Sequence, residues 1–291
     1  FVTIQYHIKQ IENLLNKEKI TKYNLLQTAF DISCVKFELS NGDKYISKYY
    51  VNENKSFNAI SAEADNLKFL NKKFNFFPEV VKFNKHYLII NYISNDKDKP
   101  NSTNEDFLES IIKIHKVSNK KYGFDFSTQI GGLKQINYFE DSWTNFFIAT
   151  RLNPMFELAN KNEDMGNFIN NKINYLINNI ENFIPNNPPP VLLHGDMWEG
   201  NILFKEKKFV GFIDPGSFFG HNEMEVAYLR WFNPVFVDSK FLDKYNDKIK
   251  LDKNYLLYEP IYQLYYALSN VALWDRFYIK ETKRLLKKLR L

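Results

Sequence analysis

Apolar residues recur with a helical period at the start of the chain and with a strand period soon afterwards. Residues 4–15 carry Ile and Leu at intervals of three or four, which predicts an amphipathic helix. Two strand-like runs within residues 34–50 flank Asn41-Gly42, a pair typical of tight hairpins. A helical pattern at 61–72 and two more strand-like runs within 83–92 follow. The first ninety or so residues are thus predicted to form a small sheet with two helices.

Beyond this region the pattern becomes helical. A polar stretch, residues 94–105, is the expected boundary between two parts. We therefore expect an α+β, protein-kinase-like fold with two lobes. Residues 1–93 would form a small N-terminal β-rich lobe, and residues 94–291 a larger, mainly helical C-terminal lobe. The helices expected in the second lobe span residues 107–117, 141–158, 167–183, 255–278 and 279–291.

The composition narrows the class of protein. The chain has 291 residues, of which 44% are hydrophobic and 25% charged, as in globular proteins. The net charge of +5 is spread along the chain, so we expect no nucleic-acid partner. We find no signal-peptide pattern and no apolar run near the roughly 18 residues of a membrane helix, so we expect no membrane partner. A single cysteine, Cys34, fits a cytoplasmic location. The sequence does not indicate the oligomeric state.

The most informative stretch lies at residues 191–215. Two apolar runs, 202–204 and 209–213, are separated by four charged residues, which predicts an antiparallel hairpin. Such pairing would place Asn201, before the first strand, beside Asp214, after the second. An amide oxygen and a carboxylate form a small site of hard oxygen ligands, which suits Mg²⁺ completed by phosphates.

Asp196 precedes Asn201 by five positions. The base and the metal-binding Asn of the protein-kinase catalytic loop have the same separation. We therefore predict that Asp196 is the general base that accepts the proton of a substrate hydroxyl, while Asn201 and Asp214 hold Mg²⁺. The alternative is that both Asp residues only form turns. His194, next to this loop, is expected to pack and hydrogen-bond rather than to bind zinc, because no partner stands at ligand spacing.

A lysine and a glutamate in the first lobe form a second candidate pair. Lys48 lies on a predicted strand and Glu63 on the helix after it, as in the kinase pair that positions the α- and β-phosphates of ATP. Lys44 and Glu53 are their rivals. The first lobe would thus bind the nucleotide, and the second would carry catalysis and substrate binding.

The nucleotide loop of this chain has few glycines. Residues 28–33 occupy the place where a glycine-rich loop is expected, and the Walker pattern is absent too. Phosphate would therefore be held there by non-glycine backbone and by the Ser33 hydroxyl. Trp198, within the catalytic loop, is either a buried aromatic residue or a platform for a sugar face. The basic amphipathic tail, residues 280–290, is expected to be a docked helix rather than a membrane-binding one.

At this point the chain resembles the fructosamine kinase (ketosamine-3-kinase) family, within the group of aminoglycoside phosphotransferases and choline kinases. The Trp after His-Gly-Asp, and Asp-Pro followed by Gly-His-x-Glu, narrow the likeness to this family. The segments that carry the resemblance are His194-Gly-Asp-Met-Trp-Glu-Gly-Asn201, Asp214-Pro-Gly-Ser-Phe-Phe-Gly-His-Asn-Glu223, residues 141–152 and Tyr262-Gln-Leu-Tyr265.

The resemblance implies ATP-dependent phosphorylation of the 3-hydroxyl of a small-molecule ketosamine, a sugar rearranged onto an amine. The 3-phosphate then eliminates and frees the amine, which implies a role in deglycation. It also implies that Asp196 is the catalytic base.

The remaining roles also follow from the resemblance. Asn201 and Asp214 would bind magnesium, and Lys48 with Glu63 would position ATP. Ile90 and Tyr92 belong to a hinge, residues 90–93, that would contact adenine through backbone groups. The residues implied to shape the substrate side or support the loop are Trp198, His221 and Glu223.

Two substitutions depart from the family pattern. Gly216 replaces the usual Ala after Asp-Pro, which we expect to be a minor change. Glu225 stands where Asp is usual, so a contact behind the catalytic loop would be made with a longer arm.

Other functions stay open beside the ketosamine kinase. The chain could phosphorylate another hydroxyl substrate, such as an aminoglycoside or choline, or could be a nucleotide-binding pseudokinase. The glycine-poor loop motivates the pseudokinase. The acidic residues that leave the aminoglycoside open are Asp243, Asp247, Asp252 and Glu259.

Overall fold

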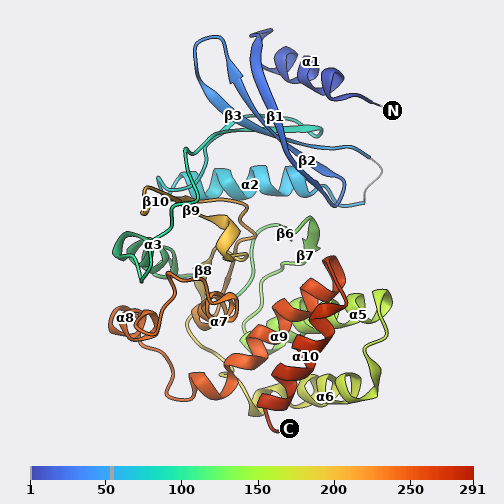
Figure 1. The fold of residues 1–291 in the computed structure, drawn as a ribbon. Helices are drawn as coiled ribbons and strands as arrows, with labels where there is room; N and C mark the ends of the chain where they lie inside the picture. The colour runs from blue at the N-terminus through green and yellow to red at the C-terminus, as the bar shows by residue number, and fades with distance from the viewer. Residues whose placement is uncertain (1, 53–55) are drawn as a thin grey trace.

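The computed structural model describes residues 2–52 and 56–291. The N-terminal part is built around an antiparallel five-stranded sheet with strand order β1-β2-β3-β5-β4. Figure 1 shows α1 on the outer side of this sheet and α2 between the sheet and the rest of the chain. The elements of this part are α1 (Ile4–Leu14), β1 (Ile20–Ala29), β2 (Ile32–Leu39), β3 (Lys44–Tyr50), α2 (Ala59–Asn71), β4 (Val80–Phe83) and β5 (Tyr87–Asn91).

The alternation of side chains along β2 gives the sheet two different faces. Val35, Phe37 and Leu39 are buried against Ile8 and Ile11 of α1. The intervening residues face the opposite way, because successive side chains of a strand point to opposite sides. That second face is turned towards α2. The helix α2 begins at Ala59 because the Asn58 side chain accepts hydrogen bonds from the N–H groups of residues 60 and 61.

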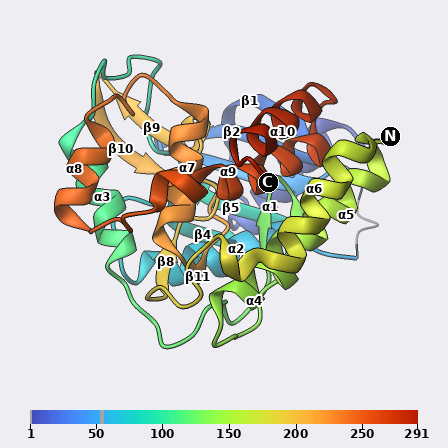
Figure 2. The same cartoon turned by 90° about the horizontal axis from the view of Figure 1, so that it is seen from below.

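The C-terminal part is mainly helical. Its long helix α9 packs against α5, α7 and α10, seen from below in Figure 2. Figure 1 shows the short strands β6, β7, β9 and β10 between α2 and these helices. Its elements are α3 (Glu105–His115), β6 (Thr128–Ile130), β7 (Leu133–Gln135), α4 (Trp143–Phe147), a π-helical turn (Ile148–Leu152), α5 (Asn153–Asn162), α6 (Gly166–Asn179), a 3₁₀ turn (Ile180–Asn182), β8 (Val191–Leu193), a second 3₁₀ turn (Glu199–Asn201), β9 (Ile202–Lys205), β10 (Lys208–Phe212), β11 (Phe218–Gly220), α7 (Asn222–Phe232), α8 (Phe241–Lys248), α9 (Tyr255–Leu273) and α10 (Phe277–Lys288).

The α+β class and the two-part plan predicted from the sequence are confirmed. The domain boundary between residues 93 and 94 stays a proposal, because one buried cluster joins Leu67 and Leu70 of α2 to Phe107 and Ile111 of α3. We find no helix long and apolar enough to cross a membrane among the described residues. The basic tail packs as α10 on α9 and α6 and buries Leu285 and Leu286.

Several elements differ from the prediction. β1 was not expected, and neither were the pair β6 and β7 or the helices α7 and α8. The helix expected over 141–158 contains a π-helical turn at Ile148–Leu152. The helix expected over 255–278 ends at Leu273, and α10 begins only at Phe277. This break matters for the site, because it turns Trp274 towards the cavity described below.

Candidate active site

Six of the site residues predicted from the sequence line one cavity of about 610 Å³ between the sheet and the helical part. The sheet contributes Cys34 and Lys48, and α2 contributes Glu63. From the helical part come the catalytic loop and, behind it, residues of α7, α9 and α10. The predicted site residues that line this cavity are Lys48, Glu63, Asp196, Trp198, Asn201 and Asp214.

The hairpin β9–β10 brings Asn201 and Asp214 together as predicted. Ile202 pairs with Phe212, and the N–H of Ile213 donates to the Asn201 carbonyl at 3.0 Å. The residues before and after the hairpin are therefore held side by side. This adjacency follows from local register alone, which is why it could be read from the sequence.

Lys48 links the two parts of the molecule. Its Nζ lies 2.6 Å from Oε1 of Glu63 on α2 and also donates to Oδ1 of Asp214. Burial alone would lower the pKa of Lys48, but the two carboxylates outweigh it and raise that pKa. Burial alone would raise the pKa of Asp214, but Lys48 holds it below its usual range. Both side chains are therefore charged. The rival Lys44 is exposed and lies outside the cavity, and Glu53 lies outside the described residues.

The side-chain oxygen atoms of Asn201 and Asp214 are suitable ligands for Mg²⁺. Asn201 Nδ2 donates to the carbonyl of Asp196 at 2.8 Å, which leaves its amide oxygen as the atom able to bind a metal ion. The Asp214 side chain is 32% exposed and reaches the cavity. No cluster of three His, Cys, Asp or Glu side chains forms a metal site within residues 2–52 and 56–291. Mg²⁺ needs no such cluster, because it is bound by one or two carboxylates together with substrate phosphates and water.

Asp196 lies in a less polar setting than Asp214. Burial raises the pKa of Asp196 to about 7, although a hydrogen bond from Tyr228 opposes the shift and the charge of Asp214 adds to it. The Tyr228 hydroxyl donates to Asp196 Oδ1 at 3.1 Å. A carboxyl group with a pKa near neutrality is suited to accept and release a proton, which is the role predicted for Asp196.

The catalytic loop is fixed from behind by Glu225 of α7. Its carboxylate accepts the N–H of His194 at 3.0 Å and the N–H of Gly195 at 2.8 Å. His115 approaches the same carboxylate at 2.7 Å. The Glu225 side chain, longer than the Asp usual at this position, thus contacts the back of the catalytic loop as expected. His194 accepts the Asp196 N–H at Nδ1, so its Nε2–H donates to the Ile213 carbonyl at 2.8 Å. This arrangement fits the packing role expected for His194.

Two glycines let the catalytic loop approach the segment after Asp214. Gly195 has φ +94°, and a Cβ there would lie 1.8 Å from the Gly216 carbonyl oxygen. A Cβ at Gly216 would lie 2.2 Å from the Gln129 carbonyl oxygen. The expectation that Gly216 is a minor departure from Ala is therefore wrong for this chain, because the backbone of Gln129 fills the space.

Trp198 is 39% exposed and faces the cavity. Its ring lies over Gly200, and its centroid is 5.8 Å from that of Phe232. Of the two readings given to this residue, the geometry favours a platform on the cavity wall over a buried aromatic residue.

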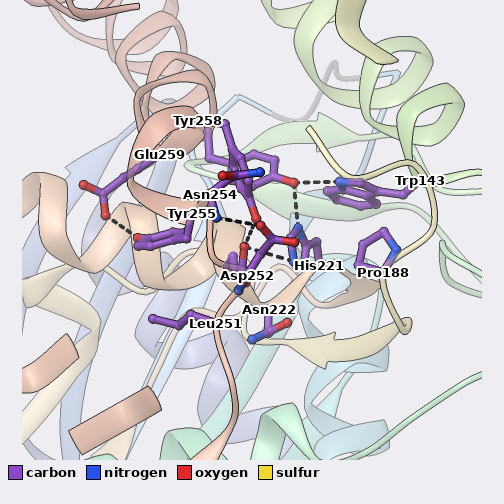
Figure 3. A network of polar contacts seen from close by, with 12 residues as sticks. Trp143, Pro188, His221, Asn222, Leu251, Asp252, Asn254, Tyr255, Tyr258 and Glu259 are labelled. Carbon is purple, nitrogen blue, oxygen red and sulfur yellow. Dashed lines mark hydrogen bonds and ion pairs between the residues drawn. The ribbon is translucent and has the colours of Figure 1, made fainter. Parts of the chain in front are cut away.

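His221 and Glu223 lie in a buried network outside the cavity lining. Figure 3 shows His221 in this network, beside Trp143 and Tyr258. Glu223 Oε2 accepts the Asp252 N–H at 2.7 Å, and its Oε1 accepts the Tyr258 hydroxyl. The Tyr262 hydroxyl accepts the Trp143 indole N–H at 2.9 Å and lies 2.7 Å from His221 Nδ1. Burial alone would raise the pKa of Glu223, but the hydrogen bonds lower it. Of the two roles implied by the resemblance, the geometry favours support over substrate contact.

Three predicted nucleotide residues also lie outside the cavity lining. Ser33 is buried on the α1 side of β2, and its hydroxyl lies 2.8 Å from that of Thr28, so the structure does not bring it to the cavity that Lys48 lines. Ile90 is paired on both sides, with Ile46 and Val80. The Tyr92 N–H donates to the Lys44 carbonyl. The hinge contact with adenine stays a prediction.

Sequence reasoning missed the aromatic side of the cavity. Tyr228 and Phe232 of α7 line it, as do Trp274 and Phe277 at the break between α9 and α10. Trp274 is 62% exposed and lies edge-to-face with Phe30 at the tip of the β1–β2 hairpin, 4.8 Å between centroids. A prediction of α7 would have pointed to Tyr228, because it lies one helical turn after Glu225.

Comparison with known proteins agrees with this geometry. The fructosamine kinase family matches residues 4–291. A protein of Enterococcus faecium named probable ketoamine kinase is 29% identical over 252 residues, which cover 83% of this chain and 86% of that one.

Solved structures share the fold. A structure described as a fructosamine-3-kinase of Thermobifida fusca superposes with a TM-score of 0.84 at 20% identity and covers 97% of both chains. An ADP-bound aminoglycoside phosphotransferase superposes with a TM-score of 0.59 at 15% identity and covers 97% of both chains. The predicted protein-kinase-like fold is thus confirmed.

Proposed function

The chain belongs to the fructosamine kinase family, and on this premise we propose that it is an ATP-dependent kinase that phosphorylates the 3-hydroxyl of ketosamines. The observation that carries the proposal is the convergence of Asp196, Asn201 and Asp214 with the Lys48–Glu63 pair in one cavity. Phosphoryl transfer depends mainly on positioning and charge neutralisation, and these groups supply both.

The residues act in three roles in the proposed reaction. Lys48, held by Glu63, neutralises and orients the phosphates of ATP. Asn201 and Asp214 would hold Mg²⁺, which would neutralise phosphate charge. The hydroxyl oxygen of the acceptor forms a bond to the γ-phosphorus, and the bond between that phosphorus and the β–γ bridging oxygen breaks. Asp196 takes the proton that the acceptor hydroxyl loses. Trp198 offers a face to the sugar.

The cavity lining supports a ketosamine over an aminoglycoside. Aminoglycosides carry several positive charges and need acidic partners. The four acidic residues that left this possibility open lie outside the cavity lining, and Asp275 is the acidic residue among the lining residues of α9, α10 and their junction. The Asp252 carboxylate instead accepts the Asn254 N–H at 2.7 Å, and Glu259 forms an ion pair with Arg230.

A choline-like acceptor is the second candidate. Aromatic rings recognise quaternary ammonium groups through their negative faces. The aromatic residues that favour this candidate are Trp198, Phe232, Trp274, Phe277 and Tyr278. A pseudokinase receives less support, because the lysine, the base and both metal-binding residues lie in the same cavity.

We further infer a cytoplasmic location and a role in deglycation. The single Cys34 fits a reducing compartment. Release of the amine after 3-phosphorylation would reverse glycation, as the family resemblance implies.

The test is a panel of acceptors assayed for Mg²⁺-dependent ADP formation. It contains fructosyl amino acids, choline, an aminoglycoside and free sugars, with the Asp196→Asn variant as the control for background ATP hydrolysis. We expect turnover with fructosyl amino acids above that control. Turnover of choline alone would replace the ketosamine by the second candidate, and turnover of none of them, with ATP still bound, would favour a pseudokinase.

A further inference from the structure

Tyr228 touches the predicted base directly. It lies on α7, is buried, and lines the cavity beside Asp196. Its hydroxyl donates to Asp196 Oδ1 at 3.1 Å. This contact is within hydrogen-bonding range and joins two side chains that are 32 residues apart in the chain.

The Tyr228 ring is held in place by its surroundings. It stacks on the ring of Tyr266 of α9, with 3.6 Å between centroids and 14° between planes. Phe232, one turn further along α7, meets it edge-to-face at 5.1 Å. A ring packed on a neighbouring helix in this way has little freedom to turn, so the hydroxyl is a fixed donor rather than a mobile one.

The two oxygens of Asp196 are held unequally. Oδ1 accepts from Tyr228, whereas Oδ2 lies 3.4 Å from Asn201 Nδ2. That amide makes its shorter hydrogen bond, 2.8 Å, to the backbone carbonyl of Asp196. Oδ2 is therefore the oxygen with more capacity to accept a proton from a substrate.

One helix fixes both the backbone and the side chain of the catalytic loop. Glu225 holds the N–H groups of His194 and Gly195, and Tyr228, three residues later on the same face of α7, holds the carboxylate of Asp196. The position of the base thus depends on α7 at two separate points.

We propose that Tyr228 is a positioning residue that orients the Asp196 carboxylate by binding Oδ1, so that Oδ2 receives the proton of the acceptor hydroxyl. The inference rests on the proposed function, because it takes Asp196 to be the proton acceptor. A Phe at this position would keep the packing on Tyr266 and lose only the hydroxyl, so the two roles can be separated.

The first experiment compares Tyr228→Phe with Tyr266→Phe, which removes a hydroxyl from the other ring of the same stack. A hydrogen bond to a charged group contributes a free energy that corresponds to about a tenfold change in rate. The kcat of Tyr228→Phe should therefore fall on the order of tenfold. The KM values for ATP and for the acceptor should stay unchanged, because Tyr228 acts on the base. Tyr266→Phe should keep kcat within about twofold. A wild-type kcat for Tyr228→Phe would overturn the proposal.

The second experiment asks whether Tyr228 acts through Asp196. In an Asp196→Ala background, Tyr228→Phe should have no further effect on the residual kcat, because residues that act as a unit are not additive. The same tenfold loss in both backgrounds would mean that Tyr228 is only structural, and would overturn the proposal.

A third readout needs no substrate. Urea unfolding of the wild type, the two single variants and the double variant gives a double-mutant cycle, which should show a non-zero coupling between Asp196 and Tyr228. Zero coupling would overturn the contact on which the proposal depends. If the contact couples but no ketosamine is turned over, the proposed function fails, and the kinetic comparison is made with the acceptor that the panel identifies.

Discussion

Asp214 and Asp196 line the same cavity in opposite surroundings. Asp214 faces Lys48, which is also paired with Glu63. The positive charge of Lys48 holds the pKa of Asp214 below its usual range. Asp196 faces the Tyr228 hydroxyl on the helical side, and burial raises its pKa to about 7. Two carboxylates whose pKa values are pushed apart can take different roles in one site. The charged side of the cavity, formed by Lys48, Glu63 and Asp214, suits a metal ion and phosphates. The aromatic side, where Asp196 meets Tyr228, suits a proton acceptor and an organic substrate.

The largest effect is expected from removing the base. Asp196→Asn keeps the shape of the side chain but cannot accept the proton, so kcat should fall by about a hundredfold to ten-thousandfold. ATP affinity should stay close to wild type, because the charged side is untouched. Steady-state kinetics and ATP titration check both. A variant with full turnover would remove Asp196 from the proposed mechanism.

Lys48→Met removes the positive charge from the charged side of the cavity and leaves Asp196 unchanged. Loss of hydrogen bonds between charged groups should raise the KM for ATP by about tenfold to a hundredfold and leave the KM for the acceptor unchanged. Lys44→Met is the matched control, because Lys44 lies on the same strand, is exposed and lies outside the cavity. Equal ATP affinities in the two variants would contradict the role given to Lys48.

The pH profile of kcat/KM compares the two carboxylates without a substitution. Asp196 must be deprotonated to accept a proton, so a raised pKa places the loss of activity on the acid side of about pH 7. The rate should fall about tenfold per pH unit below that value. Asp214, whose pKa is lowered, should add no step there. A profile that is flat down to pH 5.5 at saturating Mg²⁺ would show that the two carboxylates do not differ in this way.

The smallest change in kinetic constants is expected from Trp198, the aromatic residue proposed to offer a face to the sugar. Trp198→Ala removes an aromatic face worth about 1 kcal/mol, so the KM for the acceptor should rise only a few-fold. The KM for ATP should not change. A loss of ATP affinity instead would place Trp198 on the charged side of the cavity.

The sequence could predict those parts of the site whose geometry is local. The hairpin β9–β10 sets the positions of Asn201 and Asp214 through its own register, and Asp196 follows from its spacing to Asn201. Lys48 and Glu63 could be paired because strand and helix are neighbours in the chain. Ser33 was misplaced, since its face of β2 depends on α1, which packs there from elsewhere in the chain.

The parts that were missed lack a periodic signal. Residues 222–229 of α7 are all buried although they include Asn222, Glu223 and Glu225, so the polar residues of this helix do not mark a solvent-facing side. β1 has the opposite difficulty: as an edge strand it is exposed along most of its length, and polar and apolar residues do not alternate there. Tyr228 therefore became visible only once α7 was placed behind the catalytic loop, whereas Glu225 had been singled out from the sequence.

The most direct test of the central claim is the position of the phosphate on the product. The enzyme is incubated with Mg²⁺, ATP and a fructosyl amino acid, and the product is examined by phosphorus–proton correlation NMR. We predict a new phosphate monoester coupled to the proton on carbon 3, absent with Asp196→Asn. Phosphate coupled to another position of the sugar, or an unmodified ketosamine while a parallel incubation with choline yields phosphorylated choline, would contradict the account.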